Sequence, residues 1–160
     1  MYRMRRDVPP GVRGVKVEVL LVHPGGPLWA GKDLGAWSIP KGEYTAGENA
    51  LEVAKREFEE ETGIVPEGDF TTLGEIRQAG GKVVAAWGFE GDCDPRAVRS
   101  NMFTMEWPPR SGREQTFPEI DRAEWFGLEE ARKRIVNGQL PILEELERVI
   151  SQRGVDRSDL

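Results

Sequence analysis

Three glutamates near the end of one predicted helix could together hold a metal ion. Glu57, Glu60 and Glu61 are spaced i, i+3 and i+4, so on a helix their side chains leave the same face, with neighbouring Cβ atoms about 5–6 Å apart. Like charges at this spacing repel one another, and the last turn of a helix favours cations. A hard divalent cation with oxygen ligands would offset both effects. The alternative is a solvated acidic face, softened by Lys55 and Arg56.

The helix that must position these glutamates is predicted between Thr45 and Gly63. Thr45 and Glu48 have the spacing of a capping box at its amino end. Gly63 suits the left-handed position after the last turn, and Pro66 prevents the helix from continuing. A stripe of apolar residues at helical spacing would face a core: Leu51, Ala54 and Phe58.

The rest of the chain predicts a mixture of strands and helices. Strands are expected at 15–23, 70–77, 82–89, 101–107 and 123–126, with a short extended piece at 37–40. Gly80-Gly81 is predicted to form a hairpin turn, and a loop is expected from 108 to about 118. Helices are expected at 128–136 and 142–150. This order favours an α/β fold, a mixed sheet covered on both faces, in one domain.

Composition narrows the possible metals and partners. The chain has 160 residues and a formal net charge of −6, so no broad basic face is available for nucleic acid. Cys93 is the single cysteine and His23 the single histidine, which excludes a zinc site built from the usual nitrogen and sulfur ligands. Any metal must therefore be held by oxygen. His23, at the end of a predicted strand, is interpreted as structural rather than catalytic.

Sequence features also favour a cytoplasmic location. A lone cysteine forms no internal disulfide, which fits a reducing compartment. The basic start at 2–6 is followed by Asp7 and two prolines where a signal peptide needs an apolar core. The apolar run at 19–22 is far shorter than the ~20 residues of a membrane span. We expect neither export nor membrane insertion.

The segment from Gly42 to Ile64 follows a longer pattern, G-x5-E-x7-R-E-U-x-E-E-x-G-U, in which U is a bulky apolar residue. Every fixed position matches, and Phe58 and Ile64 fill the two apolar positions. The segment resembles the Nudix box, the signature of the Nudix hydrolase family. The resemblance implies the Nudix fold, an α/β/α sandwich with a mixed β-sheet, in a single Nudix hydrolase domain over residues 1–160.

The resemblance also implies a metal site. By this resemblance the metal-binding residues are Glu57, Glu60, Glu61, Glu48 and Gly42. Glu48 would be an accessory ligand, often through water, and the backbone carbonyl next to Gly42 would complete the set. Glycine has a physical reason there, because a side chain would obstruct a loop that passes close to the metal. The ion is expected to be Mg²⁺, with Mn²⁺ as the alternative.

The catalytic residues implied by the resemblance are Glu57, Glu60, Arg56 and Glu119. Arg56 is expected to pair with a box carboxylate and hold its orientation. The general base stays open between Glu57 and a glutamate from a later loop. Glu119, six residues before Trp125, is the first choice in that loop and Glu114 the second. The alternative for Glu119 is an ordinary loop carboxylate in water.

The activity implied is hydrolysis of a phosphoanhydride bond in a nucleoside diphosphate linked to another group. The segment 37–42 resembles the lead-in of members that act on nucleoside triphosphates or dinucleoside polyphosphates, and these substrates are favoured. ADP-ribose or a nucleotide sugar is the alternative substrate, and a non-catalytic nucleotide-binding sensor module is the alternative class. The expected partner is a small nucleotide, without nucleic acid or membrane, and a homodimer is left open by the resemblance.

Overall fold

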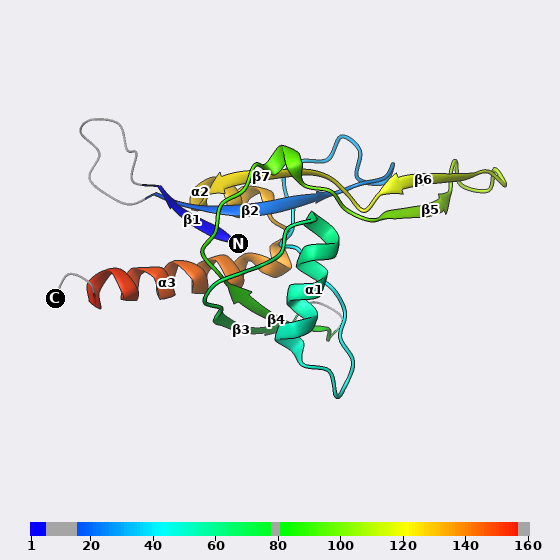
Figure 1. The fold of residues 1–160 in the computed structure, drawn as a ribbon. Coiled ribbons are helices and arrows are strands. Elements are labelled where there is room, and N and C mark those ends of the chain that lie inside the picture. The colour runs from blue at the N-terminus through cyan, green and yellow to red at the C-terminus, as the bar shows by residue number, and fades with distance from the viewer. Residues whose placement is uncertain (6–15, 78–80, 157–160) are drawn as a thin grey trace.

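The computed structural model describes residues 1–5, 16–77 and 81–156, and its arrangement is shown in Figure 1. The strands are β1 (Tyr2–Arg5), β2 (Lys16–Pro24), β3 (Thr71–Arg77), β4 (Val83–Gly88), β5 (Met102–Glu106), β6 (Glu114–Pro118) and β7 (Ile120–Gly127). The helices are α1 (Ala50–Thr62), α2 (Leu128–Arg134) and α3 (Leu140–Asp156), with 3-10 turns at η1 (Pro95–Ala97) and η2 (Asn137–Gln139). Within the described ranges, no helix combines the length and apolar character needed to cross a membrane.

The sheet contains both antiparallel and parallel pairings. β1, β2 and β7 form one antiparallel ladder in the order β1-β2-β7, and β3 pairs antiparallel with β4. β1 also runs parallel to the chain that leaves β4: the Tyr2 N–H donates to the Phe89 carbonyl at 3.0 Å, and the Gly91 N–H donates to the Tyr2 carbonyl at 2.9 Å. The expected mixed sheet is therefore present.

Helices cover both faces of this sheet. Successive side chains of β2 point to opposite faces, so each face offers apolar side chains to a helical layer. One face packs against α2 and α3 through a cluster that includes Val19, Leu21, Trp37, Phe126, Ala131 and Leu143. The other face packs against α1 through Leu20, Val22, Phe58, Phe89 and Ala123. The two buried layers produce the α/β/α sandwich.

A register shift interrupts the ladder between β2 and β7 at its far end. His23 is opposite Arg122, and Pro24 is opposite Ile120, which leaves Asp121 as an extra residue on β7. Such a bulge redirects the extra side chain and often lies beside a functional site.

The β5–β6 hairpin differs from expectation. Residues 108 to about 118 were expected to be a loop, but Glu114–Pro118 forms strand β6, in register with β5 from Met102↔Pro118 to Glu106↔Glu114. The hairpin projects from the body of the molecule (Figure 1), and residues 114–116 are exposed. A strand without a buried face carries no apolar alternation, which is why the sequence pattern did not predict it.

The start of α1 also differs from expectation. The cap is Asn49, whose side chain accepts from the N–H groups of Leu51 and Glu52 at 3.0 and 3.2 Å. The predicted capping box of Thr45 and Glu48 is wrong, because both lie in a turn before the helix, where the Thr45 hydroxyl donates to Glu48. The helix therefore begins four residues later than the spacing of Thr45 and Glu48 indicated.

The other predicted elements are present with shifted ends. β7 extends over Ile120–Gly127 instead of 123–126, and α3 is longer than 142–150. β3 and β4 pair as the hairpin expected around Gly80-Gly81, although residues 78–80 lie outside the described part. Strand β1 was not predicted. Its residues alternate as in a strand, but four residues are too few for a pattern to indicate one.

Candidate active site

Helix α1 holds the glutamate face in one orientation. Phe58 is buried on the opposite face, where its ring meets that of Phe89 edge to face at 5.2 Å. Val53 is also buried, whereas Leu51 and Ala54 of the predicted stripe are half-buried. The helix ends as predicted at Gly63, which adopts the left-handed conformation with φ 72°. These contacts fix the rotation of α1 and so the direction in which its glutamates point.

Arg56 lies among the carboxylates of the predicted site. Its guanidinium is 3.7 Å from Glu57 and 3.9 Å from Glu60. Glu48 lies within reach of the same charge: hydrogen bonds from Thr45 lower the pKa of Glu48, and the charge of Arg56 lowers it further. The structure thus gathers Glu48, Glu57 and Glu60 around one arginine.

Glu61 connects α1 to the loop before it. The backbone N–H of Lys41 donates to the Glu61 carboxylate at 2.9 Å. The pKa of Glu61 is nevertheless raised to about 7, chiefly by burial, with the charges of Glu57 and Glu119 adding to this and the hydrogen bond from Lys41 opposing it. A carboxylate with this pKa is half-protonated near neutral pH in the metal-free protein. Sequence gave no signal for the Lys41 contact, because it involves a backbone group.

Gly42 lies against Glu57. A Cβ added at Gly42 would overlap the Cγ and Cδ atoms of the Glu57 side chain. Burial raises the pKa of Glu57, the charge of Glu60 adds to this, and the charge of Arg56 opposes it. The loop therefore approaches the partly buried Glu57 side chain more closely than a residue with a Cβ would permit.

Glu119 reaches the same place from another part of the chain. It lies between β6 and β7, where its N–H donates to the Asn101 carbonyl and its carbonyl accepts from the Gly25 N–H, both at 2.9 Å. Its exposed carboxylate is close enough to raise the pKa of both Glu57 and Glu61. Glu114, the second choice, lies at the other end of β6 opposite Glu106. The structure brings Glu119, and not Glu114, to the glutamates of α1.

The donor set suits a hard divalent cation, although the carboxylates are not gathered around one point. Across residues 1–5, 16–77 and 81–156, no three His, Cys, Asp or Glu side chains are grouped as a metal site. Arg56 and the Lys41 N–H contact the glutamates instead. All the side-chain donors are carboxylate oxygens, and two of them have raised pKa values because they are partly buried near other negative charge. Such a set fits Mg²⁺ in chemistry and in charge.

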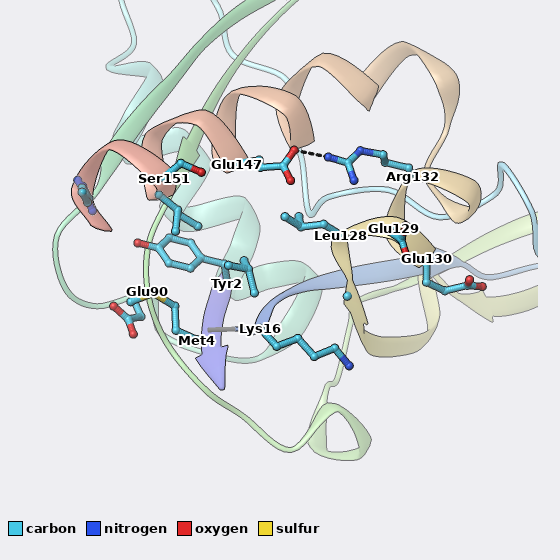
Figure 2. A pocket seen from close by; sticks show the side chains of 14 residues that line it. Tyr2, Met4, Lys16, Glu90, Leu128, Glu129, Glu130, Arg132, Glu147 and Ser151 are labelled. Atoms are coloured by element: carbon cyan, nitrogen blue, oxygen red, sulfur yellow. Dashed lines mark hydrogen bonds and ion pairs between the residues drawn. The ribbon is translucent and has the colours of Figure 1, made fainter. Parts of the chain in front are cut away.

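A cavity lies in another part of the molecule. It has a volume of about 800 Å³, and β1, α2 and α3 contribute residues to it. Figure 2 shows Tyr2 and Leu128 on its apolar side and the ion pair between Arg132 and Glu147 at its rim. No residue of the predicted metal or catalytic set lines it. The acidic end of α1 therefore lies outside this cavity.

A mixed sheet between helical layers, with an acidic helix against a glycine loop, defines a protein of the Nudix class. The family model for the NUDIX domain matches residues 10–146, which include the whole box. The chain belongs to the NUDIX family, and the predicted α/β Nudix fold is confirmed.

The chain is similar to curated proteins and to solved structures. The bis(5'-nucleosyl)-tetraphosphatase [asymmetrical] of Rattus norvegicus is 43% identical over 60 residues, which are 38% of this chain and 37% of that protein. The chain thus matches little more than a third of that relative's length. Three of the similar solved structures, at 17–22% identity, show the shared fold.

The first is a C. elegans Ap4A hydrolase in a binary complex, with 22% identity, a TM-score of 0.58 and coverage of 86% of this chain and 89% of the other. The second is the NUDIX domain of Shewanella oneidensis NrtR complexed with ADP ribose, with 17% identity, a TM-score of 0.56 and coverage of 84% and 79%. The third is a mutT/nudix family protein from Listeria innocua, with 17% identity, a TM-score of 0.59 and coverage of 96% and 91%.

Proposed function

We propose that this protein is a divalent-metal-dependent hydrolase that cleaves a phosphoanhydride bond in a nucleoside diphosphate linked to another group. One observation carries the proposal: Glu57, Glu61 and Glu119 converge from two segments far apart in sequence, so that each raised pKa has a neighbouring negative charge among its causes. This arrangement is costly for the protein alone and favourable with a cation present.

Glu57, Glu60 and Glu61 would hold the ion, with Glu48 as an accessory ligand and a backbone carbonyl beside Gly42 completing the set. Mg²⁺, or alternatively Mn²⁺, would neutralise the diphosphate oxygens and lower the pKa of the attacking water. Arg56, which lies between Glu57 and Glu60, orients their carboxylates. A phosphate chain with two or more negative charges would be bound only with such a cation between it and the glutamates.

Glu119 is our candidate for the group that takes the proton from the attacking water. Its carboxylate is exposed, lies close enough to affect the pKa of Glu57 and Glu61, and has no ion pair with any described residue. A base must reach the proton that it abstracts, and an exposed carboxylate at the rim of the site can do so. Glu57 is the alternative base, but its contact with Arg56 suits it better to metal binding.

Dinucleoside polyphosphates and nucleoside triphosphates are the substrates that we favour. The segment 37–42 supports this choice, as do the names of the rat relative and of the C. elegans structure. ADP-ribose is the second candidate, because the Shewanella NUDIX domain is complexed with it. The free thiol of Cys93 is consistent with a cytoplasmic enzyme.

The test is a panel of diadenosine tetraphosphate, ATP, ADP-ribose and a nucleotide sugar, each incubated with Mg²⁺, with products identified by mass. We expect Glu60→Gln and Glu61→Gln to lower turnover more than about 100-fold, since loss of outer-shell partners alone costs 10–100-fold. Glu59→Gln is the matched control, because Glu59 is exposed on the same turn and outside the proposed site. Binding of a nucleotide without any product would indicate the sensor module instead, and unchanged turnover in both variants would refute the catalytic assignment.

A further inference from the structure

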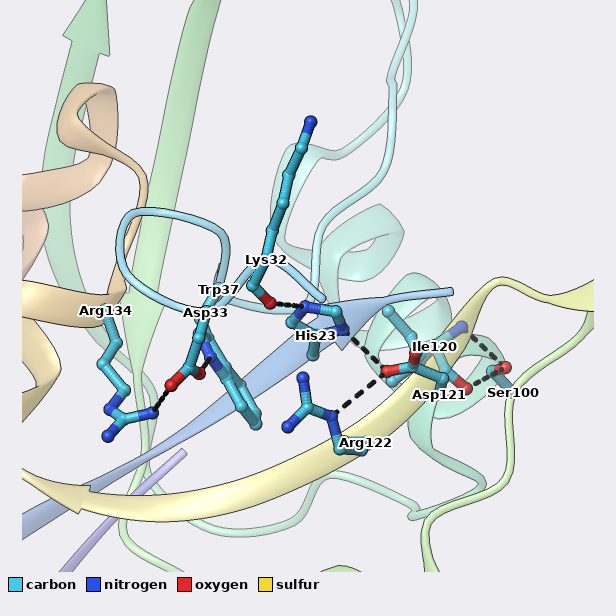
Figure 3. A network of polar contacts seen from close by, with 9 residues as sticks. All are labelled: His23, Lys32, Asp33, Trp37, Ser100, Ile120, Asp121, Arg122 and Arg134. Carbon is cyan, nitrogen blue, oxygen red and sulfur yellow. Dashed lines mark hydrogen bonds and ion pairs between the residues drawn. The ribbon is translucent and has the colours of Figure 1, made fainter. Parts of the chain in front are cut away.

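The single histidine of the chain joins three segments near Glu119. His23 is 1% exposed at the end of β2. Its Nδ1 lies 2.7 Å from Oδ1 of Asp121, at the start of β7, and its Nε2 lies 2.8 Å from the backbone carbonyl of Lys32. Figure 3 shows the ring between these two oxygens. The ring also meets Trp37 edge to face, with centroids 5.2 Å apart.

The two partners of His23 determine where its protons are. A backbone carbonyl can only accept a hydrogen bond, and an ionised carboxylate likewise only accepts. A neutral imidazole has one N–H, so it would leave one of the two short contacts as a repulsion between lone pairs. With both nitrogens protonated, both contacts become hydrogen bonds, and the contact to Asp121 also becomes an ion pair. The other charged group at Asp121 is Arg122, at 3.7 Å.

The bulge on β7 makes this contact possible. Asp121 is the extra residue between Ile120 and Arg122, which pair with Pro24 and His23. In a regular ladder the side chain of Asp121 would point to the face opposite to that of Arg122 and His23. The bulge therefore places the carboxylate of Asp121, two residues after Glu119, beside the buried His23.

Gly25 and Gly26, which follow His23, contact the chain around Glu119. The Gly25 N–H donates to the Glu119 carbonyl, and a Cβ on Gly25 would overlap the Pro118 carbonyl oxygen. Gly26, with φ 86°, lies against the Phe103 ring, where a Cβ would come within 2.9 Å of it. Segment 23–25 thus lies against segment 118–121, with no space for a side chain at Gly25, and the two segments are joined by the contacts from Gly25 to Glu119 and from His23 to Asp121.

We propose that His23 is a positioning residue for the reaction: its ring links Asp121 to the Lys32 carbonyl and so fixes Glu119 relative to the glutamates of α1. This inference rests on the proposed function in treating Glu119 as the base. His23 itself contacts neither substrate nor metal in this scheme. Its removal should therefore lower kcat more than it changes KM.

The protonation state can be tested without any activity. Because His23 is the only histidine, the imidazole signals in a ¹⁵N–¹H correlation spectrum of the full chain belong to it alone. Because both partners accept hydrogen bonds, we expect an N–H on each ring nitrogen, and in Asp121→Asn, which removes the counter-charge, we expect only one. A neutral tautomer in the unmodified protein would overturn the proposed link.

The positioning role is tested by a double-mutant cycle on kcat. We expect His23→Gln to lower kcat by about 10–100-fold, as loss of supporting hydrogen bonds does in other sites, with KM changed less than about threefold. In a Glu119→Gln background the same substitution should cost nothing further, because the group that it positions is already gone. Losses that multiply, or a Glu119→Gln variant with full activity, would overturn the role. If His23→Gln does not fold, Asp121→Asn repeats the cycle with an unchanged side-chain shape.

The control lies at the other end of the same strand. Glu18 on β2 forms an ion pair with Arg3 at 2.7 Å, far along the ladder from His23. Glu18→Gln should lower stability and leave kcat unchanged, which separates loosening of β2 from a specific effect on Glu119. If the unmodified protein hydrolyses no member of the panel, the proposed function fails, while the spectrum still reports on the link between His23 and Asp121.

Discussion

The carboxylate of Glu61 accepts a hydrogen bond from the backbone N–H of Lys41 at 2.9 Å, and this bond joins the last turn of α1 to the loop that contains Gly42. The bond does not compensate for burial, since the pKa of Glu61 is still raised to about 7. The metal-free protein therefore stores an unfavourable charge at the place where we propose that the cation binds. Two predictions depend on this residue.

Without metal, the protein should lose stability as the pH rises. The pKa of Glu61 is raised from 4.5 to about 7 on folding, so the folded state binds this proton more tightly than the unfolded chain does. Its contribution is favourable at acid pH and is lost progressively between about pH 4.5 and pH 7. Glu61→Gln keeps an acceptor for Lys41 and removes the charge. In chelator at pH 8 we expect the variant to be more stable, by on the order of 3 kcal/mol at most.

Urea denaturation at pH 5 and pH 8 in the presence of chelator measures this effect. Glu59→Gln is the control, because Glu59 is exposed on the same turn. Equal stabilities of Glu61→Gln and the unmodified protein at pH 8 would contradict the prediction.

Binding of Mg²⁺ should release protons. A carboxylate must be ionised to ligate, and at pH 6 Glu61 is mostly protonated in the metal-free protein because burial raises its pKa to about 7. We expect release of about one proton per site at pH 6 and much less at pH 8, with weaker binding at the lower pH. Calorimetric titration with Mg²⁺ in two buffers of different ionisation enthalpy measures the number of protons released per ion bound. Glu61→Gln should bind Mg²⁺ more weakly and release fewer protons, and release that is unchanged in this variant would exclude Glu61 as its source.

Gly42→Ala should weaken metal binding with little loss of stability. The added Cβ would overlap the Glu57 side chain, which can rotate away because it is not fully buried. Rotation costs little in folding but moves a proposed ligand. We expect about a tenfold or greater loss in Mg²⁺ affinity, measured by titration, with an unfolding midpoint close to that of the unmodified protein.

The double variant with Glu57→Gln shows whether the effect of Gly42 passes through Glu57. If it does, Gly42→Ala adds nothing once the Glu57 charge is gone. Losses in affinity that multiply in the double variant would show that Gly42 acts independently of Glu57.

Asn49→Ala should destabilise the protein by about 1 kcal/mol, because Asn49 accepts from two N–H groups of the first turn of α1. Thr45→Ala should cost less, since Thr45 lies outside the helix and its hydroxyl donates to Glu48 in an exposed turn. Urea denaturation at one pH compares the two variants. A larger loss for Thr45→Ala would return the cap to the position that the sequence pattern first indicated.

Local patterns predicted the elements with a buried face. The glutamate helix, its end at Gly63 and the apolar character of β2 follow from spacing and side-chain type, which act over a few residues. The cap at Asn49, strand β1 and strand β6 were not predicted. β1 is short and β6 is mostly exposed, and the cap was expected at Thr45 from its spacing to Glu48, whereas the helix begins after Asn49.

Sequence by itself determined that oxygen-rich, acidic chemistry lies on one face of α1, because helical periodicity alone brings Glu57, Glu60 and Glu61 together. Tertiary structure decided which distant groups join them: the Lys41 N–H, the close approach of Gly42 and the carboxylate of Glu119. Tertiary structure also placed Asp121 beside His23 through a bulge. The physical reason is that strand register and loop closure depend on contacts between separate segments, 20 residues apart for Lys41 and Glu61 and 98 apart for His23 and Asp121, which no local spacing encodes.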